Sequence, residues 1–407
     1  MTGRRVGALP LVLASLAVIS LTTLGANPAQ ADRVAETGWS CLVCGDAGTT
    51  DVLLNLLLFL PLGIGLRLCG WNGRRAVIAM ALFSLGIEAT QALALAGRDA
   101  SLSDILANSL GGAAGWWGWP RAATWRTRSL AHHRRGAALM IGLSTMVWLA
   151  TGWGLRPNGS DAGPWVGQPL HRWRGHDPFP GTLQRVTVNR IDVPNDPLSS
   201  TPDLTDSVAL TLDLTRHDAA PSDRPISLLR VVDGNQKLQL SVTQRGEALL
   251  VTARAQASRW RVRTPAWRFE GVMAIPPEVP WQLAWRWLGD RVELRSGPMT
   301  GDGVQVQAIA LSIGLGWVFV HPFAAAIGAP EPYRWTALWL ALFGVSIGWC
   351  LGWLPRRDAL LGAALTTLAF AGASLATGLP VQSAEVALLL GWLSAGFAGG
   401  WYIQQRR

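Results

Sequence analysis

The hydrophobic pattern divides this chain of 407 residues into three parts. Long apolar runs fill the first and last parts, whereas the middle part alternates apolar and polar residues with a period of two. Apolar runs of about 20 residues can cross a bilayer as helices, and short alternating runs are typical of strands. The pattern predicts a polytopic α-helical membrane bundle (residues 1–153), an extracytoplasmic all-β sandwich (residues 154–303) and C-terminal transmembrane helices (residues 304–407).

The first part contains five candidate spans, at residues 6–26, 52–68, 76–96, 102–119 and 136–153. The first of them also resembles a secretory signal peptide, with a basic start and a candidate cleavage site at Ala29-Gln30-Ala31. We favour a retained helix, and cleavage of residues 1–31 stays open. Arginines cluster in the loops at residues 67–75 and 121–135, which the positive-inside rule places in the cytoplasm. This orientation puts the sandwich outside.

The last part offers spans at residues 308–327, 335–354, 359–376 and 384–403. If all of them cross, Arg356 and Arg357 end up outside, against the positive-inside rule. If residues 308–327, interrupted by His321-Pro322, are re-entrant or interfacial, these arginines fall inside. We lean to that version, with eight crossings, and nine crossings remain open.

The strands of the middle part are expected at residues 185–191, 207–214, 237–242, 249–254 and 281–287. Asp233-Gly234 and Gly289-Asp290 lie where hairpin turns are expected. The tryptophans of this part are expected mainly in the core, with sugar stacking as the alternative for at least one of them; they are Trp260, Trp267, Trp281, Trp285 and Trp287.

Composition fits a membrane protein, since 49% of residues are hydrophobic and 15% are charged. The formal charge is +9, but no continuous basic face with interleaved aromatic residues accompanies it, which argues against a nucleic-acid partner. Cys41 and Cys44 fall in an expected extracytoplasmic loop, where oxidation to a local disulfide is permitted; free thiols, and metal or redox chemistry at these two residues, stay open. No metal-ligand spacing is present, so we expect no metal and no cofactor.

Isolated polar residues interrupt the apolar runs of the first part. Intramembrane polar and ionisable groups are costly, so a functional site is the default interpretation of them. They form pairs three or four residues apart, which places each pair on one helix face; the pairs are Asp51 and Asn55, Glu88 and Gln91, and Asp104 and Asn108. The expected orientations bring all three pairs to the outer half of the bilayer, beside Arg98. That arginine is placed to neutralise a carboxylate or to hold an anionic group.

These polar pairs, together with the run Leu58-Phe59-Leu60-Pro61-Leu62-Gly63 and the glycines Gly111 and Gly115, resemble the VanZ-like membrane family over residues 1–153. The resemblance implies a multi-pass protein of the bacterial cytoplasmic membrane, related to one associated with teicoplanin resistance. Residues 227–242 and 281–294 resemble, more loosely, a concanavalin A-like or laminin-G-like sandwich, a fold often used to bind glycans.

Two classes of function follow. In the first, the polar cluster binds a cell-wall or surface-glycan component or a lipid-linked precursor, with the carboxylates as acid, base or cation ligands; no reaction can be named, so enzyme activity stays open. In the second, the protein is a non-catalytic glycan-binding or scaffold protein. A third interpretation is that the amides only fix helix packing, as interhelical amides often do.

Overall fold

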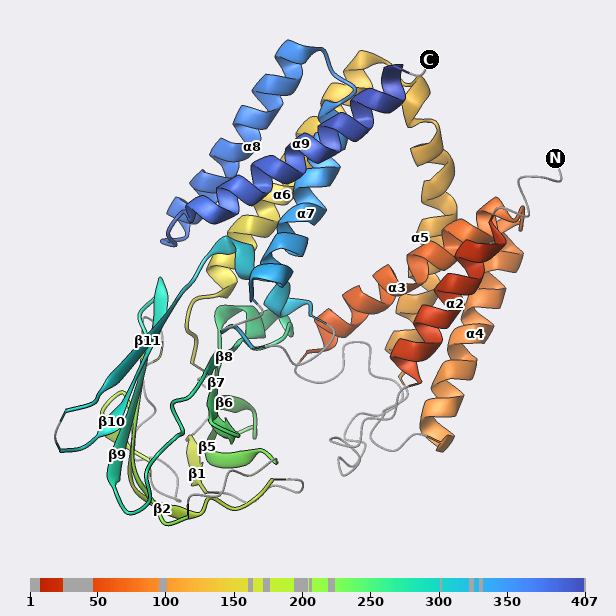
Figure 1. The fold of residues 1–407 in the computed structure, drawn as a ribbon. Coiled ribbons are helices and arrows are strands. Elements are labelled where there is room, and N and C mark those ends of the chain that lie inside the picture. Colours follow the sequence, from red (N-terminus) through yellow and green to blue (C-terminus); the bar gives the residue numbers. More distant parts are fainter. Residues whose placement is uncertain are drawn as a thin grey trace. The chain divides into compact units, whose positions relative to one another are not determined.

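The computed structural model describes residues 8–24, 47–94, 101–159, 164–170, 176–193, 204, 207–218, 224–300, 302–321, 326–328 and 332–405. The chain forms two compact units (Figure 1). The first is Met1–Arg128 with the short segment Trp260–Arg263, and the second is Ser129–Arg259 with Thr264–Arg407. The expected division at residues 153 and 303 stays a prediction.

The first unit is a helical bundle. Its helices are α2 (Leu9–Thr23), α3 (Gly48–Leu68), α4 (Gly73–Ala94) and α5 (Leu102–Ala123), followed by the 3-10 turn η2 (Trp125–Thr127). Helix α5 packs against both α3 and α4, and α2 packs against α3. Apolar side chains from α2, α3 and α4 form one buried cluster, which includes Val12, Ile19, Phe59, Leu62, Met80 and Ile87.

Gly111 and Gly115 of α5 let this helix approach α3 closely. A Cβ atom added at Gly111 would lie 2.2 Å from the Leu56 carbonyl oxygen, and one at Gly115 would lie 2.1 Å from the Leu60 carbonyl oxygen. Real Cβ atoms are not found so close to backbone oxygens. Small residues at these positions therefore set the separation of the two helices.

Six of the described helices are long and apolar enough to cross a membrane: Gly48–Leu68, Gly73–Leu93, Leu130–Gly154, Tyr333–Leu351, Arg356–Ala376 and Ser383–Gln405. Large apolar side chains, including Leu82, Leu139 and Leu368, remain exposed on them, as expected for contact with lipid. Helix α2 is apolar but spans 15 residues. Helix α5 has 22 residues, which is long enough to cross a membrane, but it is not among the six. The span expected at residues 102–119 contains the polar residues Asp104 and Asn108.

The second unit contains the remaining helices and a β-sandwich. The helices are α6 (Leu130–Gly154), α7 (Pro332–Leu351), α8 (Arg356–Ala376) and α9 (Ser383–Gln405). Helix α6 packs against α7 and α8, and α7 packs closely against α9. A Cβ added at Gly348 of α7 would lie 2.2 Å from the Leu393 carbonyl oxygen of α9, so glycine again permits close helix packing.

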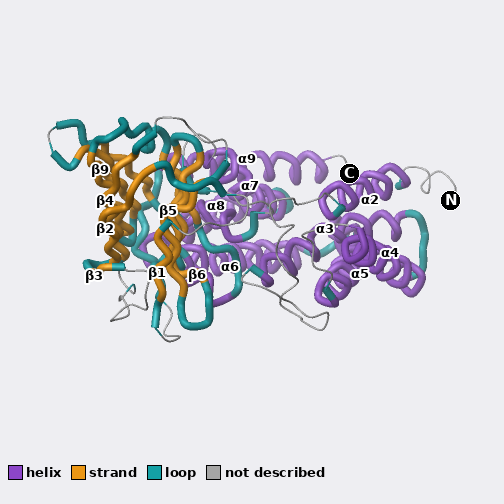
Figure 2. Tube along the Cα trace, turned by 90° about the horizontal axis from the view of Figure 1, so that it is seen from below, coloured by secondary structure: helices purple, strands orange, loops and turns teal. Residues whose placement is uncertain are grey.

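Two antiparallel sheets face each other in the sandwich (Figure 2). The five-stranded sheet has the order β1-β5-β6-β7-β8, with β1 Val166–Pro169, β5 Ile226–Val232, β6 Leu238–Arg245, β7 Ala248–Ala253 and β8 Ala266–Phe269. The six-stranded sheet has the order β11-β10-β9-β4-β2-β3, with β11 Gln305–Ala310, β10 Arg291–Pro298, β9 Pro280–Trp287, β4 Val208–Arg216, β2 Gly181–Val188 and β3 Ile191–Asp192. The 3-10 helix η3 (Gln256–Trp260) follows β7.

Each of the five expected strands overlaps an observed one. The turn that begins with Asp233 joins β5 to β6, and Gly289, with φ of 81°, lies in the turn between β9 and β10. Trp267, Trp285 and Trp287 are almost fully buried and pack on one another, with ring centroids 4.5–6.5 Å apart. These three tryptophans belong to the core and are not available for stacking on a sugar.

The apolar segment at residues 308–327 is not a helix over its described part. It begins as the end of β11, which pairs with β10, and continues as the 3-10 helix η4 (Ile313–Phe319). An arrangement with nine crossings would need a transmembrane helix at residues 308–327, and the described part of this segment is not such a helix. The last strand of the sandwich, β11, begins at Gln305, beyond the expected boundary at residue 303, and forms one edge of the six-stranded sheet.

Candidate functional site

Polar side chains from α3, α4 and α5 meet at one end of the first unit, which we call the acidic end. The Asn55 amide, in α3, donates a hydrogen bond of 2.6 Å from Nδ2 to Oδ1 of Asp104 in α5. Asp104 lies in the first turn of its helix, where a carboxylate is favoured by the helix dipole. Both side chains are partly buried, so this bond joins α3 to α5 at the edge of the bundle.

Ser101 links the Asp104 turn to the carboxylate of Glu88 in α4. The Ser101 side chain caps α5, since its Oγ accepts a bond of 3.1 Å from the Asp104 backbone N–H. The Ser101 backbone N–H donates to Oε2 of Glu88 at 2.8 Å. Glu88 is 2% exposed, so a buried carboxylate depends on this backbone donor.

Asn108 lies one helical turn further into α5 than Asp104. Its Nδ2 donates to Oγ of Ser84 in α4 at 2.9 Å, and both side chains are buried. The Asn108 Oδ1 atom is buried and has no hydrogen-bond partner among the described residues. A buried acceptor without a donor is costly in a helix bundle, so this oxygen is a natural place for a ligand or a water molecule.

Gln91 does not join this group. Its Nε2 donates to the backbone carbonyl oxygen of Thr23, at the C-terminal end of α2, with a distance of 2.8 Å. The last carbonyls of a helix lack partners within the helix, and Gln91 satisfies one of them. This geometry fits the packing interpretation for Gln91.

Asp51 faces a partner that lies far from it in the sequence. The segment Trp260–Arg263 belongs to the first unit, and Nη2 of Arg263 lies 3.6 Å from Oδ1 of Asp51. The neighbouring Thr50 hydroxyl oxygen accepts a bond from the Arg263 backbone N–H at 3.1 Å. The Asp51 side chain is 52% exposed, so the ion pair is largely solvated.

Three residues of the expected site region lie outside the described residues: Arg98, Cys41 and Cys44. Their proposed roles, as an anion ligand and as a possible disulfide, stay predictions. Within the described ranges, no group of three or more His, Cys, Asp or Glu side chains is placed to hold a metal ion.

The chemistry of the acidic end is dominated by acceptors. Carboxylate oxygens of Glu88 and Asp104 and the amide oxygen of Asn108 accept hydrogen bonds and attract cations. Carboxylate and amide acceptors of this kind bind hydroxyl and ammonium groups. A phosphate group would need a cation such as Arg98.

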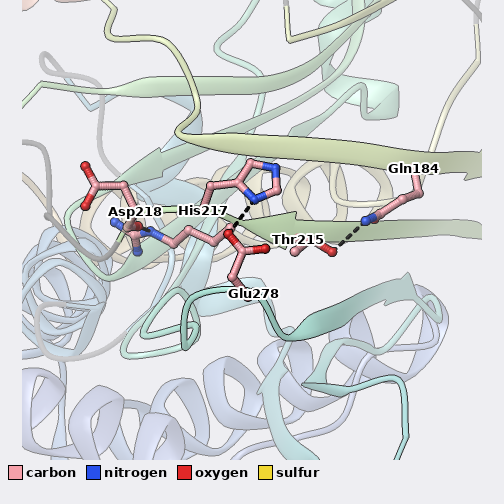
Figure 3. A network of polar contacts seen from close by, with 6 residues as sticks. Gln184, Thr215, His217, Asp218 and Glu278 are labelled. Carbon is pink, nitrogen blue, oxygen red and sulfur yellow. Dashed lines mark hydrogen bonds and ion pairs between the residues drawn. The ribbon is translucent and has the colours of Figure 1, made fainter.

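A second polar group lies at the end of β4 in the sandwich (Figure 3). Nδ1 of His217 lies 2.9 Å from Oε1 of Glu278, and the two side chains are 49% and 69% exposed. Nε2 of Gln184 donates to Oγ1 of Thr215 at 2.6 Å. The Arg216 guanidinium is buried and donates to the backbone carbonyl oxygens of Asp218 and Met273. The buried arginine holds the backbone, and His217 and Glu278 remain accessible.

Three residues of the acidic end were not anticipated from the sequence: Ser84, Ser101 and Arg263. The serine positions carry one usable signal, since Ser101 precedes an apolar helix with Asp104 three residues later, a typical helix start. Ser84 gives no such signal, because serine is common in transmembrane helices. Arg263 lies in the sequence of the sandwich, and only the fold brings it to Asp51.

Comparison with known proteins identifies the region that carries this site. Residues 13–124 match the family model described as VanZ/LLP1, and this range includes Asn55, Glu88 and Asp104. No curated protein and no solved structure matches the chain. The match lies in the N-terminal third of this membrane protein, and we call this part the VanZ/LLP1 region.

Proposed function

We propose that the acidic end of the VanZ/LLP1 region binds the polar part of a cell-wall or surface-glycan component, or of its lipid-linked precursor. The observation that carries the proposal is the hydrogen-bonded series Asn55–Asp104–Ser101–Glu88, which joins three helices at one end of the bundle. Sugar hydroxyls and amino groups are donors, and they match the acceptors gathered there. Exposed leucines on the same helices provide an apolar surface for a lipid chain.

The proposal includes the bacterial cytoplasmic membrane as the location and the extracytoplasmic side for the acidic end. A link to glycopeptide resistance, of the kind associated with teicoplanin, follows if the bound component is the precursor that such antibiotics recognise. Arg98 supplies the phosphate contact in this scheme. A chemical reaction is not part of the proposal.

The test uses two variants that keep the hydrogen bonds and remove the charge. In Glu88→Gln an amide oxygen can still accept from the Ser101 N–H, and in Asp104→Asn one can still accept from Asn55. We expect both proteins to be produced in normal folded yield, as judged by size-exclusion chromatography in detergent. We expect the cells that carry them to lose any teicoplanin tolerance that the wild-type protein confers.

Two control variants separate a site from packing. Gln91→Leu removes the bond to the Thr23 carbonyl, so it should lower thermal stability and leave teicoplanin susceptibility as in the wild type. Asp358→Asn removes a carboxylate of α8 that pairs with Arg134, 2.7 Å away, and should leave susceptibility unchanged. If Glu88→Gln and Asp104→Asn lower yield and stability as Gln91→Leu does, with no separate effect on susceptibility, the polar cluster only packs helices.

The second candidate function is glycan binding by the sandwich, as a concanavalin A-like or laminin-G-like domain. It rests on the accessible pair His217 and Glu278, which offers a donor and an acceptor on the surface at the end of β4. The test is binding of the full chain in detergent to a glycan array, compared with the double variant His217→Ala/Glu278→Ala. Binding that the double variant loses supports this function, and an array without signal contradicts it.

A further inference from the structure

The charges of the first unit are segregated along its helices. Asp51 and Asp104 lie in the first turns of α3 and α5, and the last turns of the same helices carry Arg67 and Arg121. Helix α3 has 21 residues, so its two ends are roughly 30 Å apart at 1.5 Å per residue. Helix α4 runs antiparallel to α3 and α5, so its first turn, which contains Arg74 and Arg75, lies beside their last turns. We call the end of the bundle formed by these turns the basic rim; it comprises Arg67, Trp71, Arg74, Arg75, Trp116, Trp117 and Arg121.

Trp116 of α5 contacts the end of α3, the α3–α4 connection and the start of α4. The Arg67 guanidinium lies over the Trp116 ring, 4.3 Å from its centroid, and the Trp116 indole N–H donates to the Trp71 carbonyl oxygen at 3.1 Å. The same ring lies against Gly73, where an added Cβ would be 3.1 Å from it. Arg121 lies 4.5 Å from the centroid of the Trp117 ring. The α3–α4 connection is therefore fixed on α5 by an aromatic side chain.

The arginines of the basic rim have no carboxylate partner among the described residues. Within the described part of the unit, none of Arg67, Arg74, Arg75 and Arg121 forms an ion pair with a carboxylate. Arg67 and Arg121 lie at helix C-termini, where the dipole favours a cation. Arg74 and Arg75 lie exposed in the first turn of α4, where the dipole disfavours one. The helix dipole therefore does not account for the two positive charges of Arg74 and Arg75 at this position.

We propose that the basic rim binds the anionic headgroup of a membrane phospholipid. Guanidinium groups bind phosphate in a forked geometry, and tryptophan is enriched at the headgroup level of membranes. Trp71 and Trp117 are 43% and 65% exposed, so their rings are available to that layer. A lipid is favoured over a soluble anion because Val77 and Ile78, three residues after Arg74 and Arg75 on α4, have exposed side chains that present an apolar surface to acyl chains.

The experiment measures lipid binding to the purified full chain in detergent by native mass spectrometry. Phosphatidylglycerol and phosphatidylcholine with the same acyl chains are the two probes. We expect the wild-type protein to bind phosphatidylglycerol roughly tenfold more tightly or better, since each arginine near an anionic lipid adds a severalfold preference. The double variant Arg74→Gln/Arg75→Gln should lose roughly tenfold or more of its affinity for phosphatidylglycerol.

Two matched variants and one further probe make the result specific. Arg74→Lys/Arg75→Lys keeps the charge and should keep most of the binding, whereas Arg286→Gln/Arg295→Gln removes the same charge from exposed positions on β9 and β10 and should change nothing. Equal binding of the two lipids, or full binding by Arg74→Gln/Arg75→Gln, would overturn the proposal. So would thermal stabilisation by millimolar inorganic phosphate equal to that by phosphatidylglycerol, because the basic rim would then be a site for a soluble anion.

Discussion

The hydrogen bond between the Asn55 amide and the Asp104 carboxylate joins α3 to α5. Its contribution to stability can be measured by mutating the two residues singly and together. In a double-mutant cycle of Asn55→Ala and Asp104→Ala, we expect a coupling free energy of about 1 kcal/mol, the scale of interhelical hydrogen bonds in membranes. The measurement is thermal or denaturant unfolding in detergent. We expect the coupling to stabilise the folded protein, because Nδ2 of Asn55 and Oδ1 of Asp104 are 2.6 Å apart.

The matched cycle pairs Asn55→Ala with Thr90→Ala. Thr90 is exposed and donates to the Gly86 carbonyl of its own helix, so it shares no partner with Asn55. Its effect should add to that of Asn55→Ala within about 0.5 kcal/mol. A coupling near zero for Asn55 and Asp104, equal to that of the control pair, would show that the bond contributes nothing to the bundle.

At the residue scale, part of this polar cluster can be predicted from the sequence. Asn55, Glu88 and Asp104 stand out because a polar side chain in an apolar run carries a large desolvation cost. Helical spacing places Gln91 on the same face of α4 as Glu88, but the Gln91 side chain binds the Thr23 carbonyl oxygen instead of the cluster. The spacing of two residues in a helix does not show which neighbouring helix each side chain contacts. Backbone partners such as the Ser101 N–H carry no signal in the side-chain pattern.

At the scale of the elements, the glycines of α5 give a prediction with an internal control. Gly115→Ala would place a Cβ 2.1 Å from the Leu60 carbonyl oxygen, so α3 and α5 must move apart. We expect a loss of roughly 1–3 kcal/mol in the free energy of unfolding, the usual cost of overpacking. The measurement is the unfolding transition of the purified protein.

Gly118→Ala is the control, since it lies on the same helix and an added Cβ there meets no atom within 4 Å. Alanine has the higher helix propensity, so this variant should be neutral or more stable by up to about 1 kcal/mol. If the two variants behaved alike, the close packing of α3 and α5 would not be a determinant of stability.

The pattern of apolar positions predicts elements well where one period dominates. The alternating runs correspond to strands such as β7 and β9, because one face of each strand is buried and the other is not. Strand β5 does not alternate, because nearly all of its residues are buried, and the expected turn at Asp233-Gly234 is the signal that marks its end. Residues 308–327 are apolar enough to be a candidate span, and the favoured version in which they do not cross agrees with the observed strand and 3-10 helix; the pairing of β11 with β10 leaves no trace in composition.

At the scale of the whole molecule, a buried carboxylate ties parts of the second unit together. Glu385, in the first turn of α9, accepts hydrogen bonds from the Ser312 hydroxyl and from the Gly314 backbone N–H at the start of η4. The side chain is 4% exposed, and a Cβ at Gly314 would lie 2.2 Å from its Oε1 atom. Because η4 connects the last strand of the sandwich to α7, Glu385 holds this connection against α9.

This arrangement predicts that Glu385→Ala frees η4, whereas Glu385→Gln does not, because an amide oxygen still accepts both bonds. Hydrogen bonds to charged groups contribute about 1.5–3 kcal/mol, so amide hydrogens of Ile313–Phe319 should exchange roughly tenfold faster or more in Glu385→Ala. Hydrogen exchange followed by mass spectrometry measures this, with peptides of α8 as the internal reference. Unchanged exchange in Glu385→Ala, or equal acceleration in Glu385→Gln, would show that η4 is held by its apolar contacts and not by the carboxylate.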